Sequence, residues 1–170
     1  MLIRRESPAD VDAIRTVTTR AFDGKPYSNG SEPRLVDALR SDPGWIPALS
    51  LVAEVDRAVV GHGVCTRATI SGRPVLGLGP LSVDPARQRR GVGSALVHAL
   101  LGAADALGEP LVVLLGDPAY YHRFGFTLAS EYGIDPPVPQ WAPSFQARTL
   151  STYRPDLRGP FEYAAPFQDA

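Results

Sequence analysis

The order of the expected elements predicts a mixed α/β (α+β) fold. The strand-like segments 48–55 and 58–70 are separated only by Asp56-Arg57, a pattern typical of a tight hairpin between antiparallel strands. A strand–helix–strand–helix–strand series follows, in which the apolar run 111–115 comes directly after a helix. Because a crossover helix joins parallel strands, this run predicts one parallel pair in an otherwise mostly antiparallel sheet.

Size and composition predict one domain spanning residues 1–170, since 44% of the residues are hydrophobic and can form a sizeable core. Charged residues make up 21% of the chain and the net charge is −1, which excludes an overall field that favours nucleic acid or an anionic membrane. The N-terminus lacks an apolar signal core, and no apolar run predicts a membrane span. Cys65 is the only cysteine, so we expect no intrachain disulfide and a reducing, cytoplasmic setting.

The N-terminal part is expected to supply one strand and two helices before the hairpin. Ser7 precedes Pro8, and a helix is predicted to begin there because serine is a preferred N-cap and proline fits the first helical position. The sequence Asp-Pro-Gly at 42–44 ends the second helix. The predicted elements are a strand at 2–5, a helix to about residue 22, a polar loop at 23–30, a helix opened at 31–33, and the two hairpin strands.

The C-terminal part is expected to supply the parallel pair and the closing strands. Leu96, Val97 and Leu100 recur at helical spacing and predict an amphipathic helix. The predicted elements are a strand at 75–83, a helix at 92–107, a strand at 111–115, a short helix at 119–124, a strand from 126, an irregular loop at 134–143, and strands at 147–150 and 162–164.

The turn between strand 75–83 and the next helix carries the strongest functional signal. It reads Gln-Arg-Arg-Gly-Val-Gly-Ser at 88–94. The first N–H groups of a helix lack intrahelical partners and lie at its positive end, so with the neighbouring arginines they predict a diphosphate site. An ordinary turn with solvated arginines is the alternative. The turn is neither a Walker loop, since no Lys-Ser/Thr pair follows, nor a dinucleotide fingerprint, which needs a third glycine.

Two blocks of the chain together resemble the GNAT superfamily of N-acetyltransferases. The strand, the sequence Val-Asp-Pro at 83–85, the turn 88–94 and the apolar helix resemble its acetyl-coenzyme A motif, Gln/Arg-x-x-Gly-x-Gly/Ala. The sequence Leu-Leu-Gly-Asp-Pro-Ala-Tyr-Tyr-His-Arg-Phe-Gly-Phe at 114–126 resembles the later segment that ends in Tyr-x-x-x-Gly-Phe. The wording of this block, together with residues 49–54 and 61–62, is similar to the YhbS-like branch.

The resemblance implies a mixed, mostly antiparallel sheet of six to seven strands, about four flanking helices and a splayed parallel pair. It also implies that acetyl-coenzyme A is bound as the acyl donor. Because His62, His98 and His122 are widely spaced and there is one cysteine, we expect no metal site. The diphosphate would rest on the turn while the pantetheine amides pair with the preceding strand like an added strand. The implied cofactor-binding residues are Leu81, Ser82, Val83, Gln88, Arg89, Arg90, Gly91, Val92, Gly93 and Ser94.

The resemblance implies one catalytic residue, Tyr121, which stands five residues before Phe126. A phenol there would protonate the leaving thiolate, since phenol and thiol have similar reference pKa values. Simple packing of the helix against the sheet is the alternative. No carboxylate lies in strand 75–83, so the base candidates are Glu54, His62 and Asp117, each with a structural alternative. A water chain or an amine that arrives neutral would replace such a base.

The implied reaction is direct transfer of an acetyl group to a primary amine in a ternary complex, in a bacterial enzyme. The alternatives are a non-catalytic acyl-coenzyme A-binding regulatory module, or an acyltransferase with another acyl donor or an oxygen acceptor. The loops 23–30 and 134–144 are expected to border the acceptor site, where Tyr27, Trp141 and Phe145 either line it or anchor the loops. We expect no nucleic-acid or membrane partner, and a homodimer remains open.

Overall fold

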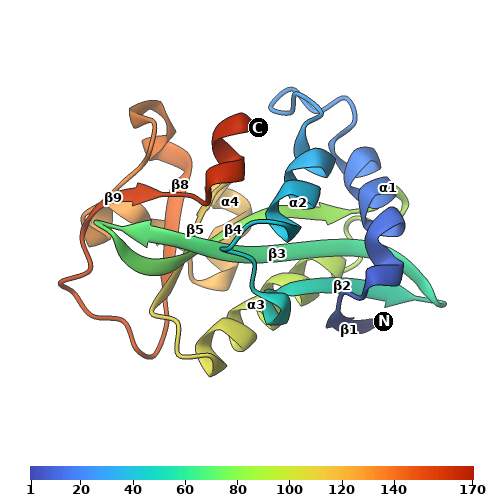
Figure 1. Ribbon diagram of the computed structural model, residues 1–170, viewed down its shortest axis with the longest axis horizontal. Coiled ribbons are helices and arrows are strands. Elements are labelled where there is room, and N and C mark those ends of the chain that lie inside the picture. The colour runs from blue at the N-terminus through green and yellow to red at the C-terminus, as the bar shows by residue number, and fades with distance from the viewer.

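The computed structural model describes residues 1–170 and contains nine strands in a mixed sheet with helices on both faces (Figure 1). The strand order is β1-β2-β3-β4-β5-β8-β6, while β9 pairs with β3 and β7 pairs with β9. The strands are β1 Leu2–Arg5, β2 Ser50–Val55, β3 Ala58–Ile70, β4 Arg73–Val83, β5 Leu111–Leu115, β6 Thr127–Leu128, β7 Ile134–Asp135, β8 Phe145–Thr149 and β9 Gly159–Glu162. The α-helices are α1 Val11–Phe22, α2 Glu32–Arg40, α3 Val92–Ala106 and α4 Pro118–Tyr121. The predicted mixed fold class is therefore confirmed.

Several element boundaries differ from the sequence expectations for local reasons. The segment expected to begin a strand at residue 48 first forms a 3₁₀ turn, Pro47–Leu49, because proline lacks the N–H that a ladder needs. The loop 134–143 contains the short strand β7 and runs into a 3₁₀ segment, Pro139–Ser144. The last strand lies at Gly159–Glu162 rather than at 162–164. The strand count of nine exceeds the expected six to seven, and two of the nine, β6 and β7, are only two residues long.

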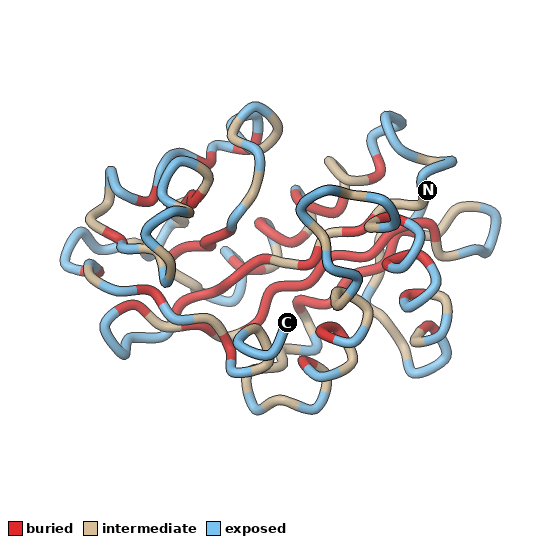
Figure 2. Tube along the Cα trace, turned by 90° about the horizontal axis from the view of Figure 1, so that it is seen from above, coloured by how far each residue is buried: buried red, intermediate tan, exposed pale blue.

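The hairpin between β2 and β3 forms as the sequence predicts. Asp56 and Arg57 both have positive φ angles, 51° and 64°, which is the backbone twist that a two-residue hairpin turn requires. The long strand β3 then supplies the antiparallel partner of β4. These strands form the middle of the sheet, and the buried residues run along them between the helical layers (Figure 2).

A β-bulge in β4 bends the strand beside the candidate site. Cys65 of β3 faces Leu78 and Gly63 faces Leu81, so that Gly79 and Pro80 together stand opposite one residue of β3. An extra residue of this kind bends the bulged strand and increases its twist. The side chains of Leu78 and Leu81 consequently both pack toward α3, on either side of the bulge.

The parallel pair β4–β5 separates just before this bulge. Its pairing is confined to Leu76 with Val112 and Gly77 with Val113, and β5 then continues beside β8. From residue 78 to residue 83, β4 therefore has no strand on the side that faces β5. The predicted splay of the parallel pair is confirmed, and it leaves a wedge whose apex is Gly77.

Helix α3 packs closely against the face of the sheet opposite α1 and α2 (Figure 1). A Cβ at Gly61 of β3 would lie 2.9 Å from Val92 and 3.0 Å from Leu96, so glycine is needed for this approach. The largest cluster of buried apolar side chains lies between α3 and strands β2 to β5. This packing fixes the N-terminal end of α3 relative to β4. None of the helices has the length and apolar character that a membrane span requires.

Candidate functional site

The turn that leads from β4 into α3 presents a row of unpaired N–H groups. Arg89 and Gly91 have φ angles of 60° and 81°, and this left-handed backbone turns the chain sharply before α3 begins at Val92. The first backbone bond of the helix runs from Ala95 N to Gly91 O, at 2.9 Å. The backbone N–H groups of residues 90–94 have no acceptor within the chain. Together with the positive end of the helix dipole, unpaired N–H groups in this arrangement are suited to an anion.

Internal hydrogen bonds hold this turn in shape. Gln88 Nε2 donates to the carbonyl oxygen of Val83 at 3.1 Å and so ties the turn back to the end of β4. Asp84 accepts from the N–H of Ala86 at 2.9 Å and forms an ion pair with Arg20 of α1 at 2.7 Å. The turn is therefore fixed before any ligand arrives.

The arginine side chains of the turn are free to meet an anion. Arg89 and Arg90 are exposed, and neither has an acidic partner within 4.0 Å. Two unneutralised cations beside a row of N–H donors add charge to the site without a desolvation penalty in the free protein. The arrangement fits a polyanion better than a single carboxylate.

The last three residues of β4 offer backbone rather than side chains to the wedge. Leu81 and Val83 pack their side chains against the α3 cluster. Ser82 is buried, and its hydroxyl donates to Thr18 Oγ1 of α1 at 3.2 Å. Only the peptide groups on the open side of β4 remain available for a ligand.

Tyr121 lies at the end of α4 with its ring packed into the same corner of the molecule. A Cβ at Gly116 would lie 2.5 Å from its Cε2, and the rings of Phe126 and Phe124 lie 5.8 and 6.3 Å away, centroid to centroid. Burial raises the pKa of the Tyr121 phenol well above its usual value, and the nearby phenols of Tyr120 and Tyr27 raise it further. The group stays protonated at neutral pH, but the raised pKa makes it a weaker acid than the coenzyme A thiol. Its hydroxyl makes no hydrogen bond within the chain.

Two of the three base candidates are already engaged in structural contacts. Glu54 accepts a hydrogen bond from Arg4 Nε at 2.9 Å at the edge of the sheet. Asp117 caps α4 by accepting from the N–H of Ala119 at 2.9 Å. Both carboxylates therefore have structural roles: Glu54 pairs with Arg4, and Asp117 caps α4.

The third candidate, His62, is sealed inside the protein. Its ring is 0% exposed, and its Nε2 lies 2.9 Å from Ser50 Oγ and 3.2 Å from Glu6 Oε2. Burial lowers the pKa of His62, against the opposing effect of Glu6, so the ring is neutral at pH 7. With no exposed surface, His62 cannot take a proton from a bound amine.

Glu6 is the charged centre of this buried group. Burial alone would raise its pKa, but hydrogen bonds from His62, Arg40 and Ser50 outweigh burial and lower it from 4.5 to about 2. Arg40 Nε lies 2.6 Å from Glu6 Oε1. A carboxyl whose pKa is depressed by folding stabilises the fold above its ordinary pKa, and this contribution is lost as the pH falls toward the folded-state pKa.

The variant Glu6→Gln tests this contribution. We expect it to lower the free energy of unfolding at pH 7 by about 2 kcal/mol, because hydrogen bonds to a charged acceptor are lost. We also expect the wild-type protein to lose stability between pH 4.5 and 2 more steeply than the variant. Urea denaturation at several pH values measures both effects. The exposed Glu131→Gln is the control, and identical pH profiles for Glu6→Gln and wild type would contradict the prediction.

The remaining candidates divide between core and surface. Cys65 is fully buried in the α3 cluster, and burial raises the pKa of its thiol, so it is a packing residue. Phe145 is 1% exposed and packs against Phe161, so it anchors its segment rather than lining a site. Trp141 packs at the edge of the second apolar cluster, which contains Phe145 and Phe161. Tyr27 is 75% exposed in the loop 23–30, with its ring edge-on to Phe22.

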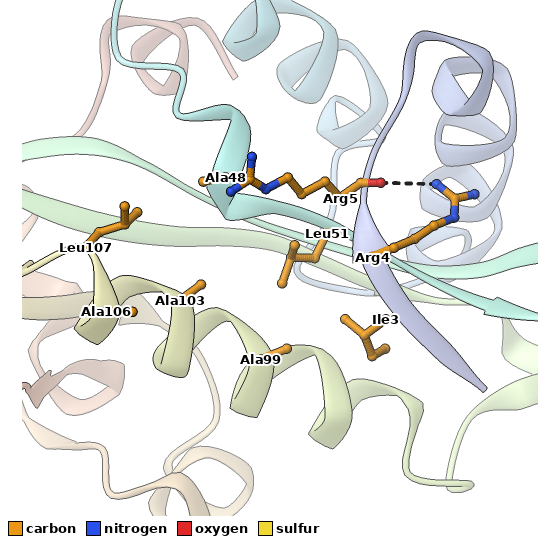
Figure 3. A pocket seen from close by; sticks show the side chains of 9 residues that line it. All are labelled: Ile3, Arg4, Arg5, Ala48, Leu51, Ala99, Ala103, Ala106 and Leu107. Carbon is orange, nitrogen blue, oxygen red and sulfur yellow. Dashed lines mark hydrogen bonds between the residues drawn. The ribbon is translucent and has the colours of Figure 1, made fainter.

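A shallow cavity elsewhere does not include any predicted site residue. It has a volume of about 410 Å³ and lies between α3 and the β1–β2 edge of the sheet (Figure 3). It is lined by Ile3, Arg4, Arg5, Ala48, Leu51, Ala99, Ala103, Ala106 and Leu107. The candidate site is instead the open wedge and turn at the other end of α3. No group of three or more histidine, cysteine, aspartate or glutamate side chains is arranged to hold a metal ion.

The structure brings the turn, the free edge of β4 and Tyr121 into one corner, and it adds a residue that the sequence analysis did not single out. Tyr120 lies between the two blocks: its ring is edge-on to Tyr121 at 4.9 Å, and its hydroxyl lies over Gly93. The only sequence signal was the doubled tyrosine, which does not reveal which ring meets α3.

Comparison with known proteins identifies the family to which the chain belongs. Residues 47–128 match the family model described as an acetyltransferase (GNAT) domain, a span that includes the turn and Tyr121. The chain is 34% identical over 154 residues to the N-acetyltransferase YhbS of Escherichia coli K12, covering 89% of this chain and 88% of that protein.

Two crystal structures share the fold over nearly the whole chain. YhbS from Escherichia coli in complex with coenzyme A has a TM-score of 0.89 at 32% identity, covering 98% of this chain and 91% of that one. A GNAT family acetyltransferase from Brucella melitensis in complex with acetyl-coenzyme A has a TM-score of 0.82 at 39% identity, covering 98% and 97%. The chain therefore belongs to the GNAT superfamily of N-acetyltransferases, enzymes of the acyltransferase class, and is similar to its YhbS-like members.

Proposed function

We propose that residues 1–170 act as one N-acetyltransferase domain that binds acetyl-coenzyme A and transfers its acetyl group to a primary amine. The observation that carries this proposal is the row of unpaired N–H groups at residues 90–94, next to an unpaired stretch of β4. The crystallised relatives with coenzyme A and acetyl-coenzyme A support the choice of ligand. The one buried, reduced cysteine agrees with a cytoplasmic setting.

In the proposed complex the diphosphate lies on the turn and the pantetheine arm lies in the wedge. The N–H groups of Arg90 through Ser94 donate to the phosphoryl oxygens, and the Arg89 and Arg90 side chains add charge. A Cβ at Gly91 would meet nothing within 4 Å, so the phosphates can approach the backbone there, whereas the Cβ position of Gly93 is filled by the Tyr120 hydroxyl. The peptide groups of Leu81, Ser82 and Val83 pair with the pantetheine amides as a sheet edge pairs with an added strand.

The proposed reaction is a direct attack within the ternary complex. The amine nitrogen bonds to the thioester carbonyl carbon, the carbon–sulfur bond breaks, and the thiolate takes the proton of the Tyr121 phenol. A β4 N–H in the wedge stabilises the oxyanion as it forms. No base candidate faces the wedge with a free side chain, so the amine attacks in its neutral form, the proton that its nitrogen loses as the amide forms passes to water, and solvent reprotonates Tyr121.

The acceptor is proposed to enter beside the loop 23–30. Tyr27 lies in this loop with its ring edge-on to Phe22 at the end of α1. The exposed ring of Tyr27 is therefore available to contact an incoming amine. We propose a homodimer only as an alternative to a monomer, and sedimentation distinguishes the two.

Two measurements test the proposed function. Calorimetry is expected to show saturable, one-site binding of acetyl-coenzyme A to the purified protein. A screen of primary amines with a thiol-detecting assay is expected to show release of coenzyme A that depends on the amine. Absence of saturable binding would overturn the proposal at its first step.

The non-catalytic binding module is the second candidate, because Glu54 and Asp117 are engaged in structural contacts and His62 is fully buried. Binding without turnover across a broad range of amines and alcohols would favour it. Competition with other acyl thioesters tests the remaining alternative, in which the acyl group is not acetyl.

A further inference from the structure

The hydroxyl group of Tyr120 lies at the first turn of α3 without a partner in the chain. A Cβ placed on Gly93 would lie 2.7 Å from this oxygen, so the phenol is in direct contact with the glycine backbone. Tyr120 donates and accepts no side-chain hydrogen bond, although its backbone oxygen accepts one. An unsatisfied hydroxyl thus lies beside Gly93, one of the residues whose backbone N–H groups have no acceptor.

Aromatic contacts fix the direction of this hydroxyl. The Tyr120 ring lies edge-on to Tyr121 at 4.9 Å and to Phe124 at 5.4 Å, centroid to centroid. Edge-to-face pairs of this kind favour one ring orientation. A rigid ring loses little entropy when its hydroxyl binds a ligand, so the group is preorganised.

A cation stands behind the same ring. The Arg123 guanidinium lies 4.8 Å from the Tyr120 ring centroid, and its Nε donates to the Tyr120 carbonyl oxygen at 2.9 Å. Arg123 is exposed and has no acidic partner within 4.0 Å. A positive charge over the ring makes the phenol a better hydrogen-bond donor, and it adds to the positive field at the turn.

We propose that Tyr120 is a cofactor-binding residue whose hydroxyl donates a hydrogen bond to the diphosphate of the acyl donor, with Arg123 as the cation that supports it. The inference rests on the proposed function and adds a residue from the second block to the diphosphate site. It also explains why glycine stands at position 93, because a side chain there would displace the Tyr120 hydroxyl.

The proposal has a structural consequence for the neighbouring residue. Tyr120 and Tyr121 are consecutive and in ring contact, so a diphosphate held by the first restrains the second. Binding at the turn would therefore help to hold the acid in place for the thiolate. Positioning of this kind is a general source of catalytic acceleration.

Tyr120→Phe removes only the oxygen and keeps the ring contacts. We expect its Kd for coenzyme A to rise about tenfold, since a hydrogen bond to a charged acceptor is lost. The Kd for 3′-dephospho-coenzyme A, which keeps the diphosphate, is expected to rise by the same factor. The ³¹P resonances of the bound diphosphate are expected to shift relative to those in the wild-type complex. Calorimetry, ³¹P NMR and a melting curve are the measurements.

Tyr153→Phe is the matched control, because it removes a phenol from a different cluster of the protein. It is expected to bind both ligands as the wild type does. Unchanged Kd values for Tyr120→Phe, or an effect seen with coenzyme A but not with its dephospho form, would overturn this inference and leave the proposed function standing. Failure of the wild-type protein to bind coenzyme A would overturn the proposed function itself.

Discussion

Replacing Tyr121 by phenylalanine is expected to lower kcat roughly a hundredfold or more while leaving the Kd for acetyl-coenzyme A unchanged. The ring contacts with Phe124 and Phe126 survive the change, so only the transferable proton is lost. Without it, coenzyme A must leave as a free thiolate. The thiol-release assay, with an amine found in the screen, measures kcat, and calorimetry measures Kd.

The pH profile provides an independent check on the same residue. Burial and the phenols of Tyr120 and Tyr27 raise the pKa of Tyr121 above 10, so its proton is still present where an exposed phenol would have lost it. We therefore expect no alkaline loss of kcat that is due to Tyr121 at or below pH 10. Tyr132→Phe, remote from the wedge, is the control. A Tyr121→Phe enzyme with wild-type kcat would show that the residue only packs.

Gly93→Ala is expected to weaken binding of acetyl-coenzyme A by roughly 10- to 100-fold, the range that an overpacked contact costs. The added Cβ would lie 2.7 Å from the Tyr120 hydroxyl oxygen, closer than real Cβ contacts come. The turn or α4 must then shift, and the N–H groups lose their alignment with the diphosphate. Calorimetry of the purified variant measures the loss.

The same helix contains a control for this substitution. Gly102 also lies in α3, and a Cβ there meets nothing within 4 Å, so Gly102→Ala is expected to bind normally and to be up to about 1 kcal/mol more stable. Combining Gly93→Ala with Tyr120→Phe removes the clashing oxygen and leaves Val83 at 3.6 Å as the nearest atom. We expect this double variant to recover thermal stability but not full affinity. If Gly93→Ala binds as tightly as the wild type, no phosphate lies against this backbone.

Local sequence patterns predicted the elements that can be recognised without knowing their distant partners. The apolar run at β5 and the helical spacing in α3 needed no distant partner to be recognised, and the observed bounds agree within a residue. The short strand β9 could not be placed this way, because its position depends on pairing with Thr69 and Ile70 of β3, some ninety residues earlier. Strands defined by long-range pairing leave little trace in a two- to four-residue window.

The site divides in the same manner. The spacing of glycines and arginines in the turn predicted a diphosphate site. The backbone N–H groups that lack an acceptor lie in this turn, as predicted. The burial of His62 and the orientation of Tyr120 depend on how distant elements pack against one another. No local sequence pattern specifies this packing. Sequence thus indicated the class of ligand better than the complete set of side chains around it.

The bulge at Gly79 and Pro80 separates the shape of the groove from the packing of the core. Since Leu78 and Leu81 face the same helix on either side of it, a strand shortened by one residue there would keep every neighbouring side chain on its present face. β4 shortened in this way would lose its bend, and the space between β4 and β5 would become narrower. One residue of excess length therefore sets the bend of β4 beside the proposed thioester site, whereas the packing of the hydrophobic core does not depend on it.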